Sequence, residues 1–356
     1  MPGRLPHGLA FFVGRVTAMV GEGLLALIVA LGLLVATVVG LVMGRANRHK
    51  LSAEYVARGN TCRAQKNYAG AVRAFSRAIR LDTNSTEAYR QLGGVYKQLE
   101  RYPEAVAAYQ KVLEKDPNNH VINVHLGQAY EALNQTDKAL ERYHAAIQAN
   151  ASYAFGHVNI GRLYLRNGRI DEAVASFKNA LKADAGYIQA YHLLAEAHCE
   201  QGQHNQAIEQ YEAAIKAAPT DADSYNGLAS LYMRLHQYEK AVDNYQSALI
   251  YAPESATIQT NLGLAFYRLN RYEEAIAALR TALGLKPNYA PAQYTLAAAL
   301  MQKDMQAEAL ELLLSAVENA PELAKSALSE SVYAKLRTTP EFQQHFSKWM
   351  SEVSEG

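Results

Sequence analysis

Six side chains that could bind a metal ion or carry acid–base chemistry lie within one short stretch of the chain. They are His192, Glu196, His198, Cys199, Glu200 and His204. On a helix, His192, Glu196 and Cys199 share one face, and histidine, glutamate and cysteine are all zinc ligands. Packing explains the same residues more simply. His198 stands at a position where the chain elsewhere has a tyrosine. Arg162, which stands 34 residues before Glu196, is a partner for that carboxylate. We therefore predict no metal site and no cofactor.

No other pattern in the sequence is typical of catalysis. The chain has no phosphate-binding glycine loop, no nucleophile elbow and no paired catalytic carboxylates, so we predict no catalytic residues. Lys and Arg number 35 against 34 Asp and Glu, which gives a net charge of +1 and argues against nucleic acid as a partner. A remote alternative is an accessory subunit of an enzyme complex whose active site lies on another chain.

A strict internal period organises most of the sequence. Alanine recurs every 34 residues without insertion or deletion, at Ala71, Ala105, Ala139, Ala173, Ala207, Ala241, Ala275 and Ala309. Twelve residues before each alanine stands a glycine or another alanine. A fixed period of this length predicts stacked copies of one small unit rather than a single globular core.

Each copy reads as two amphipathic helices. In the second copy, Tyr89, Leu92 and Tyr96 recur at helical spacing, and the chain turns near residues 100–102. The copy ends at Asp116-Pro117-Asn118, where proline cannot continue a helix. We expect the small residues to lie where the two helices cross.

The pattern resembles the tetratricopeptide repeat, with runs such as LGGVY and LGQAY, an alanine twelve residues later and a closing proline. The resemblance covers residues 52–323 in eight copies. It implies an all-α, right-handed superhelical solenoid in which the first helix of each copy lines a concave groove. Residues 324–356 are expected to form capping helices and a tail. There, Thr339 and Pro340 mark a helix start, and Phe342, Phe346, Trp349 and Met350 face the last copy.

The groove of copies four to eight is the predicted binding surface. Equivalent positions on the first helices place methionine and tyrosine beside alternating charges, which suits the apolar face of a peptide and its carboxylates. The predicted contact residues are Arg162, Arg166, Glu196, Met233, Arg234, Tyr267, Arg268 and Met301. The alternative is that these side chains pair with one another.

The first fifty residues suggest a membrane anchor. Residues 23–44 carry no charge and would span about 33 Å as a helix, so we predict a transmembrane helix there. Residues 1–22 form its flank and 45–51 a basic linker. Small residues at every fourth position would allow another membrane protein, or a second copy of the chain, to pack closely. They are Gly32, Ala36, Gly40 and Gly44.

The excess of positive charge after the predicted anchor, at Arg45, Arg48 and Lys50, places the repeats in the cytoplasm. The stretch MGRANRHKLSAEYVARGN is similar to the start of the lipopolysaccharide assembly protein B family, which implies a single-pass protein of the bacterial inner membrane. That family ends in a rubredoxin-like metal domain, which this sequence lacks.

The predicted function is that of a non-enzymatic, membrane-anchored scaffold or adaptor. Its groove would bind protein or peptide partners during assembly or regulation of a membrane or envelope complex. A periplasm-facing scaffold of a secretion or exopolysaccharide system is the alternative.

Overall fold

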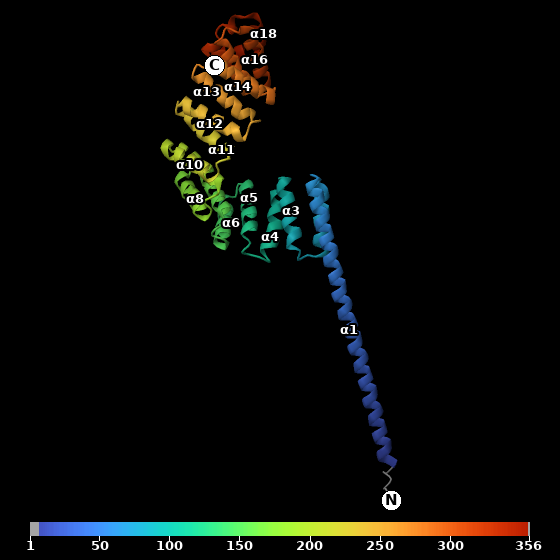
Figure 1. The fold of residues 1–356 in the computed structure, drawn as a ribbon. Helices are drawn as coiled ribbons and strands as arrows, with labels where there is room; N and C mark the ends of the chain where they lie inside the picture. Colours follow the sequence, from blue (N-terminus) through green and yellow to red (C-terminus); the bar gives the residue numbers. More distant parts are fainter. Residues whose placement is uncertain (1–6, 355–356) are drawn as a thin grey trace. The chain divides into compact units, whose positions relative to one another are not determined.

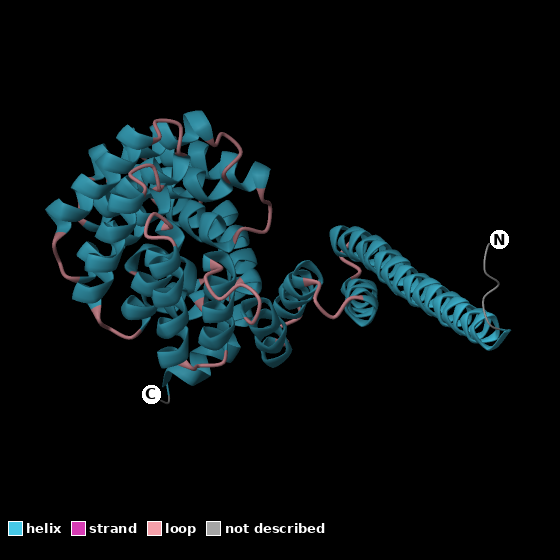
Figure 2. Ribbon diagram, turned by 90° about the horizontal axis from the view of Figure 1, so that it is seen from below, coloured by secondary structure: helices cyan, strands magenta, loops and turns pink. Residues whose placement is uncertain are grey.

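The computed structural model describes residues 7–354, with side chains described from residue 42 to 347 and at some positions between 27 and 38. All secondary structure in this range is helical, and no strand occurs in it (Figure 2). The chain divides into two compact units, Met1–Asn150 and Ala151–Gly356. The prediction of an all-α repeat solenoid is confirmed.

The first unit contains six helices. They are α1 (His7–Ala64), α2 (Tyr68–Leu81), α3 (Thr86–Gln98), α4 (Tyr102–Leu113), α5 (His120–Ala132) and α6 (Thr136–Ala149). In each copy the two helices lie side by side, as α3 and α4 do in the ribbon drawing (Figure 1). The end of α1 serves as the first helix of the first copy, packed against α2.

The second unit contains ten repeat helices and a closing segment. The repeat helices are α7 (Ala154–Arg166), α8 (Ile170–Ala183), α9 (Ile188–Glu200), α10 (His204–Ala217), α11 (Ala222–Arg234), α12 (Tyr238–Tyr251), α13 (Ala256–Arg268), α14 (Tyr272–Leu285), α15 (Ala290–Met301) and α16 (Gln306–Asn319). The closing elements are α17 (Leu323–Ser329), the 3₁₀ turns η1 (Ser331–Tyr333) and η2 (Leu336–Thr338), and α18 (Pro340–Ser354).

One backbone conformation joins the two helices of every copy. A residue with positive φ follows each first helix, with φ between 57° and 71°. These residues recur at the same interval as the alanines: Lys66, Glu100, Asn134, Gly168, Gly202, His236, Asn270 and Asp304. A left-handed residue at this place ends a helix and satisfies its last carbonyl groups. The turn predicted near residue 100 is found there.

Small residues allow the helices of a copy to cross closely. A Cβ atom added to Gly93 would lie 2.6 Å from the ring of Tyr109, and one added to Gly127 would lie 2.5 Å from the ring of Tyr143. Both rings are buried. Glycine is therefore required for these aromatic side chains to fill the space between the helices.

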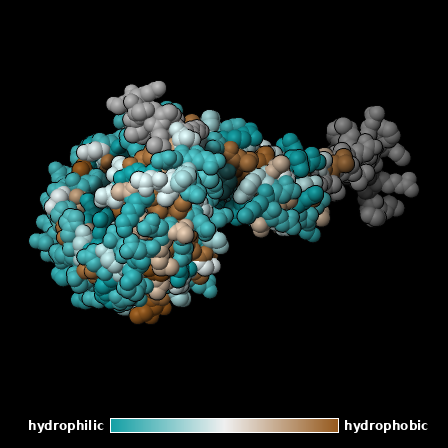
Figure 3. Space-filling view, turned by 90° about the horizontal axis from the view of Figure 1, so that it is seen from above, coloured by the Kyte–Doolittle hydropathy of each residue, from teal (hydrophilic) through white to brown (hydrophobic). Residues whose placement is uncertain are grey.

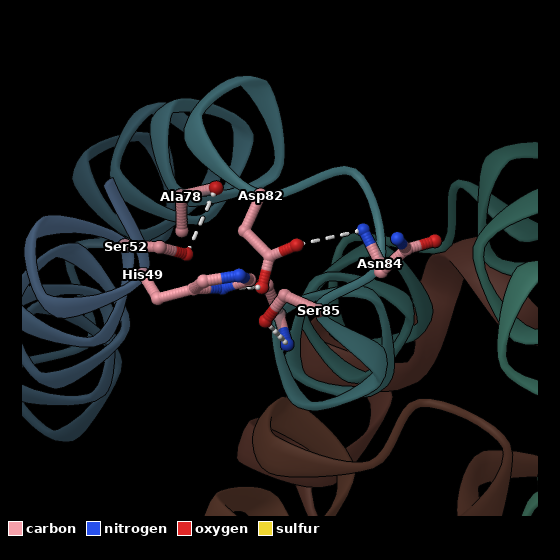
Figure 4. Close-up of polar contacts among 7 residues, drawn as sticks. His49, Ser52, Ala78, Asp82, Asn84 and Ser85 are labelled. Atoms are coloured by element: carbon pink, nitrogen blue, oxygen red, sulfur yellow. Dashed lines mark hydrogen bonds and ion pairs between the residues drawn. The ribbon is translucent and has the colours of Figure 1, made fainter. Parts of the chain in front are cut away.

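The junction between α1 and the first copy is held by polar contacts (Figure 4). The buried Ser52 hydroxyl donates a hydrogen bond to the Ala78 carbonyl at 3.0 Å. His49 Nδ1 lies 2.9 Å from a carboxylate oxygen of Asp82, and the other oxygen accepts the Asn84 amide at 3.0 Å. These contacts fix the end of α1 against the loop that follows α2.

The closing segment covers the last copy with aromatic side chains. Phe342 and Phe346 of α18 are fully buried and stack at 4.0 Å between ring centroids. The buried Tyr333 hydroxyl donates to the Tyr294 carbonyl of α15 at 2.8 Å. The side chains of Trp349 and Met350 lie outside the described residues.

The predicted transmembrane helix is wrong, and with it the single-pass membrane localisation. Across the residues that the structure describes, none of the helices combines the length and apolar character needed to span a bilayer. Residues 23–44 do not form an element of their own. They lie within α1, which continues without a break through the charged residues 45–51 into the first copy.

The small-residue stripe predicted within that segment is described at one position only. Gly44 is exposed, and a Cβ atom added to it would meet nothing within 4 Å. The surroundings of Gly32, Ala36 and Gly40 lie outside the described residues, as do residues 1–6 of the predicted flank.

Candidate partner-binding groove

The first helices line the inner side of the stack in the second unit. Three pairs of successive first helices touch, α7 with α9, α11 with α13 and α13 with α15, whereas α9 and α11 approach each other less closely; among the described residues the second helices show no comparable contact. A stack curves toward the side on which its elements approach most closely. The accessible faces of α7, α9, α11 and α13 therefore form the groove.

A pocket of about 310 Å³ opens between α9 and α11 on these faces. It is lined by Glu196, Cys199, Glu200, Tyr211, Gly227, Ser230, Leu231 and Arg234. Two of the predicted contact residues, Glu196 and Arg234, are thus brought to one pocket from adjacent copies. Sequence reasoning did not find the parts played by Tyr211 and Gly227.

One wall of the pocket departs from the repeat pattern. Gly227 is the only glycine at its position in the eight copies, and the ring of Tyr211 lies against it. The seven equivalent residues are Ala57, Gln91, His125, Asn159, Leu193, Asn261 and Thr295. On the other side of the ring, Ala195 carries a methyl group where five copies have glycine. The glycine beside this ring thus stands at position 227 and not at position 195. That difference from the other copies is what the sequence could have shown.

Burial perturbs the ionisable groups of the pocket. It raises the pKa of the Glu196 carboxyl above its ordinary value; Glu200 adds to this shift, and His192 and Arg162 oppose it. Burial also raises the pKa of Tyr211 to about 12. Burial disfavours the charged form of a carboxyl group, and Glu196 shows this shift although the residue as a whole is classed as exposed.

The other predicted contact residues differ in accessibility. Arg162, Arg166 and Arg268 are exposed on the first helices, and Met233 and Tyr267 are partly buried against the core. Met301 is only 7% exposed and belongs to the core. The accessible part of the predicted surface is therefore mainly charged. The face drawn in Figure 3 is also mostly hydrophilic, with smaller hydrophobic areas between.

Two of the three histidines of the fifth copy have partners in the fold, whereas His204 Nδ1 is buried without a hydrogen-bond partner. His192 Nε2 lies 2.7 Å from the Ser224 hydroxyl, and His198 Nδ1 lies 2.7 Å from the Gln203 side-chain oxygen. Within residues that the structure describes, no three His, Cys, Asp or Glu side chains are grouped as metal ligands. The arrangement thus gives these histidines structural roles.

A second pocket, of about 280 Å³, lies in the first unit and was not predicted. Its charged lining is basic, with Arg63, Arg90 and Lys97, and His125 lies beside them. Arg90 is paired with Glu87 at 2.6 Å, and Lys97 donates to the side-chain oxygen of Gln128 at 2.8 Å. Arg63 and Lys97 occupy the same repeat position in the first and second copies, so the sequence carried a signal for this part of the basic lining.

Comparison with known families identifies the repeat. Models of the tetratricopeptide repeat match the chain in overlapping stretches that together extend from residue 59 to residue 331. The stretches are 59–100, 86–119, 108–141, 125–188, 164–232, 226–290 and 267–331. The chain therefore belongs to the tetratricopeptide repeat family. The finer likeness to lipopolysaccharide assembly protein B stays a prediction.

Solved structures show the same fold. A tetratricopeptide repeat protein from Parabacteroides merdae is 18% identical with a TM-score of 0.51, covering 69% of this chain and 98% of that one. A thermophilic protein of this class from Thermus thermophilus is 25% identical (TM-score 0.42; 51% and 99% covered). YrrB, described as having an unusual peptide-binding site, is 22% identical (TM-score 0.44; 54% and 100% covered). No curated protein matches the chain.

Proposed function

We propose that this protein is a non-enzymatic scaffold whose second unit binds an extended segment of a protein partner along α7, α9, α11 and α13. The bound partner would be held for assembly into a larger complex. The observation that carries the proposal is the pocket between α9 and α11, which is lined by first-helix residues of two adjacent copies.

The charges along this face support a peptide ligand. Arg162 and Arg234 are exposed, and neither forms an ion pair with any residue in the described part of the chain. Glu196 belongs to the fifth copy, between the copies that carry Arg162 and Arg234, and it also forms no ion pair with a described residue. Unpaired charges of both signs along a groove favour a segment that supplies the complementary charges.

Selection from a phage-displayed library of random peptides, using the full chain as bait, tests the proposal. Fluorescence anisotropy then measures the affinity of the enriched peptides. We expect Arg162→Glu with Arg234→Glu to weaken binding about tenfold or more, because both charges on the groove are reversed.

The matched control reverses two exposed lysines on second helices, Lys178→Glu in α8 and Lys216→Glu in α10. This double variant has the same change in net charge and should bind as the unmodified protein does. Equal loss in both double variants would show a general charge effect, and enrichment of no peptide would refute the proposed function.

A further inference from the structure

The pocket between α9 and α11 contains two carboxylates without partners. Glu196 and Glu200 stand four residues apart on α9, and both line the pocket. Neither accepts a hydrogen bond or forms an ion pair within residues 42–347, where side chains are described. Two like charges held side by side in this way are stabilised by a cation placed between them.

A second, independent observation comes from Tyr211. This side chain is only 9% exposed, it lines the same pocket, and its hydroxyl forms no hydrogen bond with any described residue. Of the three equivalent tyrosines, Tyr143 and Tyr245 have hydroxyl partners and Tyr109 has none among the described residues. The hydroxyl of Tyr143 donates to Glu131 at 2.7 Å, and that of Tyr245 lies 3.1 Å from the Ser230 hydroxyl. The hydroxyl oxygen itself is not fully buried, so it is open to a ligand group that can form a hydrogen bond with it.

The walls of the pocket limit what can enter. Arg234 lies on α11, opposite the carboxylates of α9, so the pocket is acidic on one side and basic on the other. Its volume of about 310 Å³ suits one long side chain rather than a folded element. Gly227 lets the Tyr211 ring pack against α11 as one wall of the pocket, since every other copy except the first, which has alanine, carries a larger side chain at that position.

We propose that this pocket receives a basic side chain, lysine or arginine, of the segment bound in the groove. The inference rests on the proposed function and adds the chemistry of one ligand position. The cationic group pairs with Glu196 and Glu200, and the Tyr211 hydroxyl accepts one of its hydrogen bonds. Arg234 remains free to meet a carbonyl or carboxylate next to it on the peptide.

The ionisation of Glu196 supports this assignment and gives it a pH dependence. The charged groups around it are His192 and Glu200 on its own helix, Arg162 on α7, Tyr211 on α10 and Arg234 on α11. Burial raises the pKa of Glu196, so this carboxylate becomes neutral at a higher pH than an ordinary glutamate. Affinity for a cationic side chain should therefore fall as the pH is lowered toward that pKa.

Filling the pocket tests the inference. The double variant A195G/G227N introduces the residues that stand at the equivalent positions 68 residues earlier, Gly127 of the third copy and Asn159 of the fourth. The helix therefore has a natural precedent for both changes, and circular dichroism checks that helicity is kept. Random-peptide selections are run in parallel on the full chain and on this variant. The unmodified protein should enrich peptides with a lysine or arginine at one fixed position, and the variant should lose that preference.

The affinity of an enriched peptide then measures the contribution of the basic side chain. Replacing its lysine by norleucine, or its arginine by citrulline, should weaken binding about tenfold, and E196Q/E200Q should make the two peptides equal. The control E209Q/E212Q removes the same charge from exposed positions of α10 and should preserve the difference.

The outcomes separate the two proposals. Enrichment of no peptide by the unmodified protein overturns both. Enrichment of peptides without a fixed basic residue, or the same preference after the pocket is filled, overturns this inference and leaves the proposed function standing. An unchanged effect of norleucine or citrulline in E196Q/E200Q would also overturn it.

Discussion

His125 shows how a single residue makes the fold sensitive to pH. Burial lowers the pKa of its imidazole, and the cation of Lys97 on α3 adds to this shift, as does Arg90. The ring stacks on Tyr109 of α4 at 5.7 Å, and Gln128 on its own helix lies 3.5 Å away and opposes the shift. The folded protein therefore holds His125 neutral where an unfolded chain would take up a proton.

The sign of the pH effect follows from that difference. A histidine whose pKa is lowered by folding contributes its full stabilisation at pH values above the pKa of the unfolded chain, about 6.5. This contribution is lost as the pH falls from there toward the lower pKa of the folded protein. We expect the thermal midpoint of the protein to decrease between pH 7 and pH 5. His125→Gln, which places the residue of the second copy at this position, should reduce that decrease. An equal pH dependence in the variant would show that His125 titrates as in the unfolded chain.

At the residue scale, the repeat pattern predicted which positions are small and which are aromatic, because these follow from packing that every copy shares. It did not predict that Gly227 would line a pocket. That property depends on a departure from the repeat, combined with the position of Tyr211 on another helix. Met301 was placed on the groove by its register, yet it is buried in the core.

Among the elements, the closing helix α18 depends on two aromatic side chains. Phe342 and Phe346 are fully buried and stacked. Removing a buried phenylalanine ring costs about 3–5 kcal/mol, so Phe342→Ala or Phe346→Ala should detach the cap. Limited proteolysis should then cleave first within residues 321–354. Gln344→Ala, at an exposed position of the same helix, is the control and should leave the cleavage pattern unchanged. Unaltered cleavage in both phenylalanine variants would mean that α18 is held by other contacts.

Helix starts and ends were largely readable from the sequence, since α18 begins at Pro340 and the turn of the second copy falls at Glu100. The long helix α1 was not. An uncharged run and a charged run were assigned to separate elements, whereas backbone hydrogen bonding continues through both. Hydrophobicity shows where polarity changes along a helix and does not by itself show where the helix ends.

For the whole molecule, the pattern of contacts predicts that a destabilising substitution loosens only the helices near it. Each repeat helix of the second unit packs mainly on its neighbours in the chain, as in other solenoids. Ala173 is fully buried at the crossing of α7 and α8, and Ala173→Leu should overpack it at a cost of about 1–3 kcal/mol. Hydrogen exchange should speed up in α7, α8 and α9 and stay unchanged in α13 and α14. Uniform loss of protection throughout the second unit would indicate a single cooperative core.

Because a left-handed residue follows the first helix of every copy, one helical hairpin can replace another. Since all eight are closed by one backbone conformation, a hairpin can be duplicated, deleted or exchanged as a cassette without redesigning a loop. Transplanting the fifth and sixth hairpins together would carry their shared pocket into another solenoid of this family.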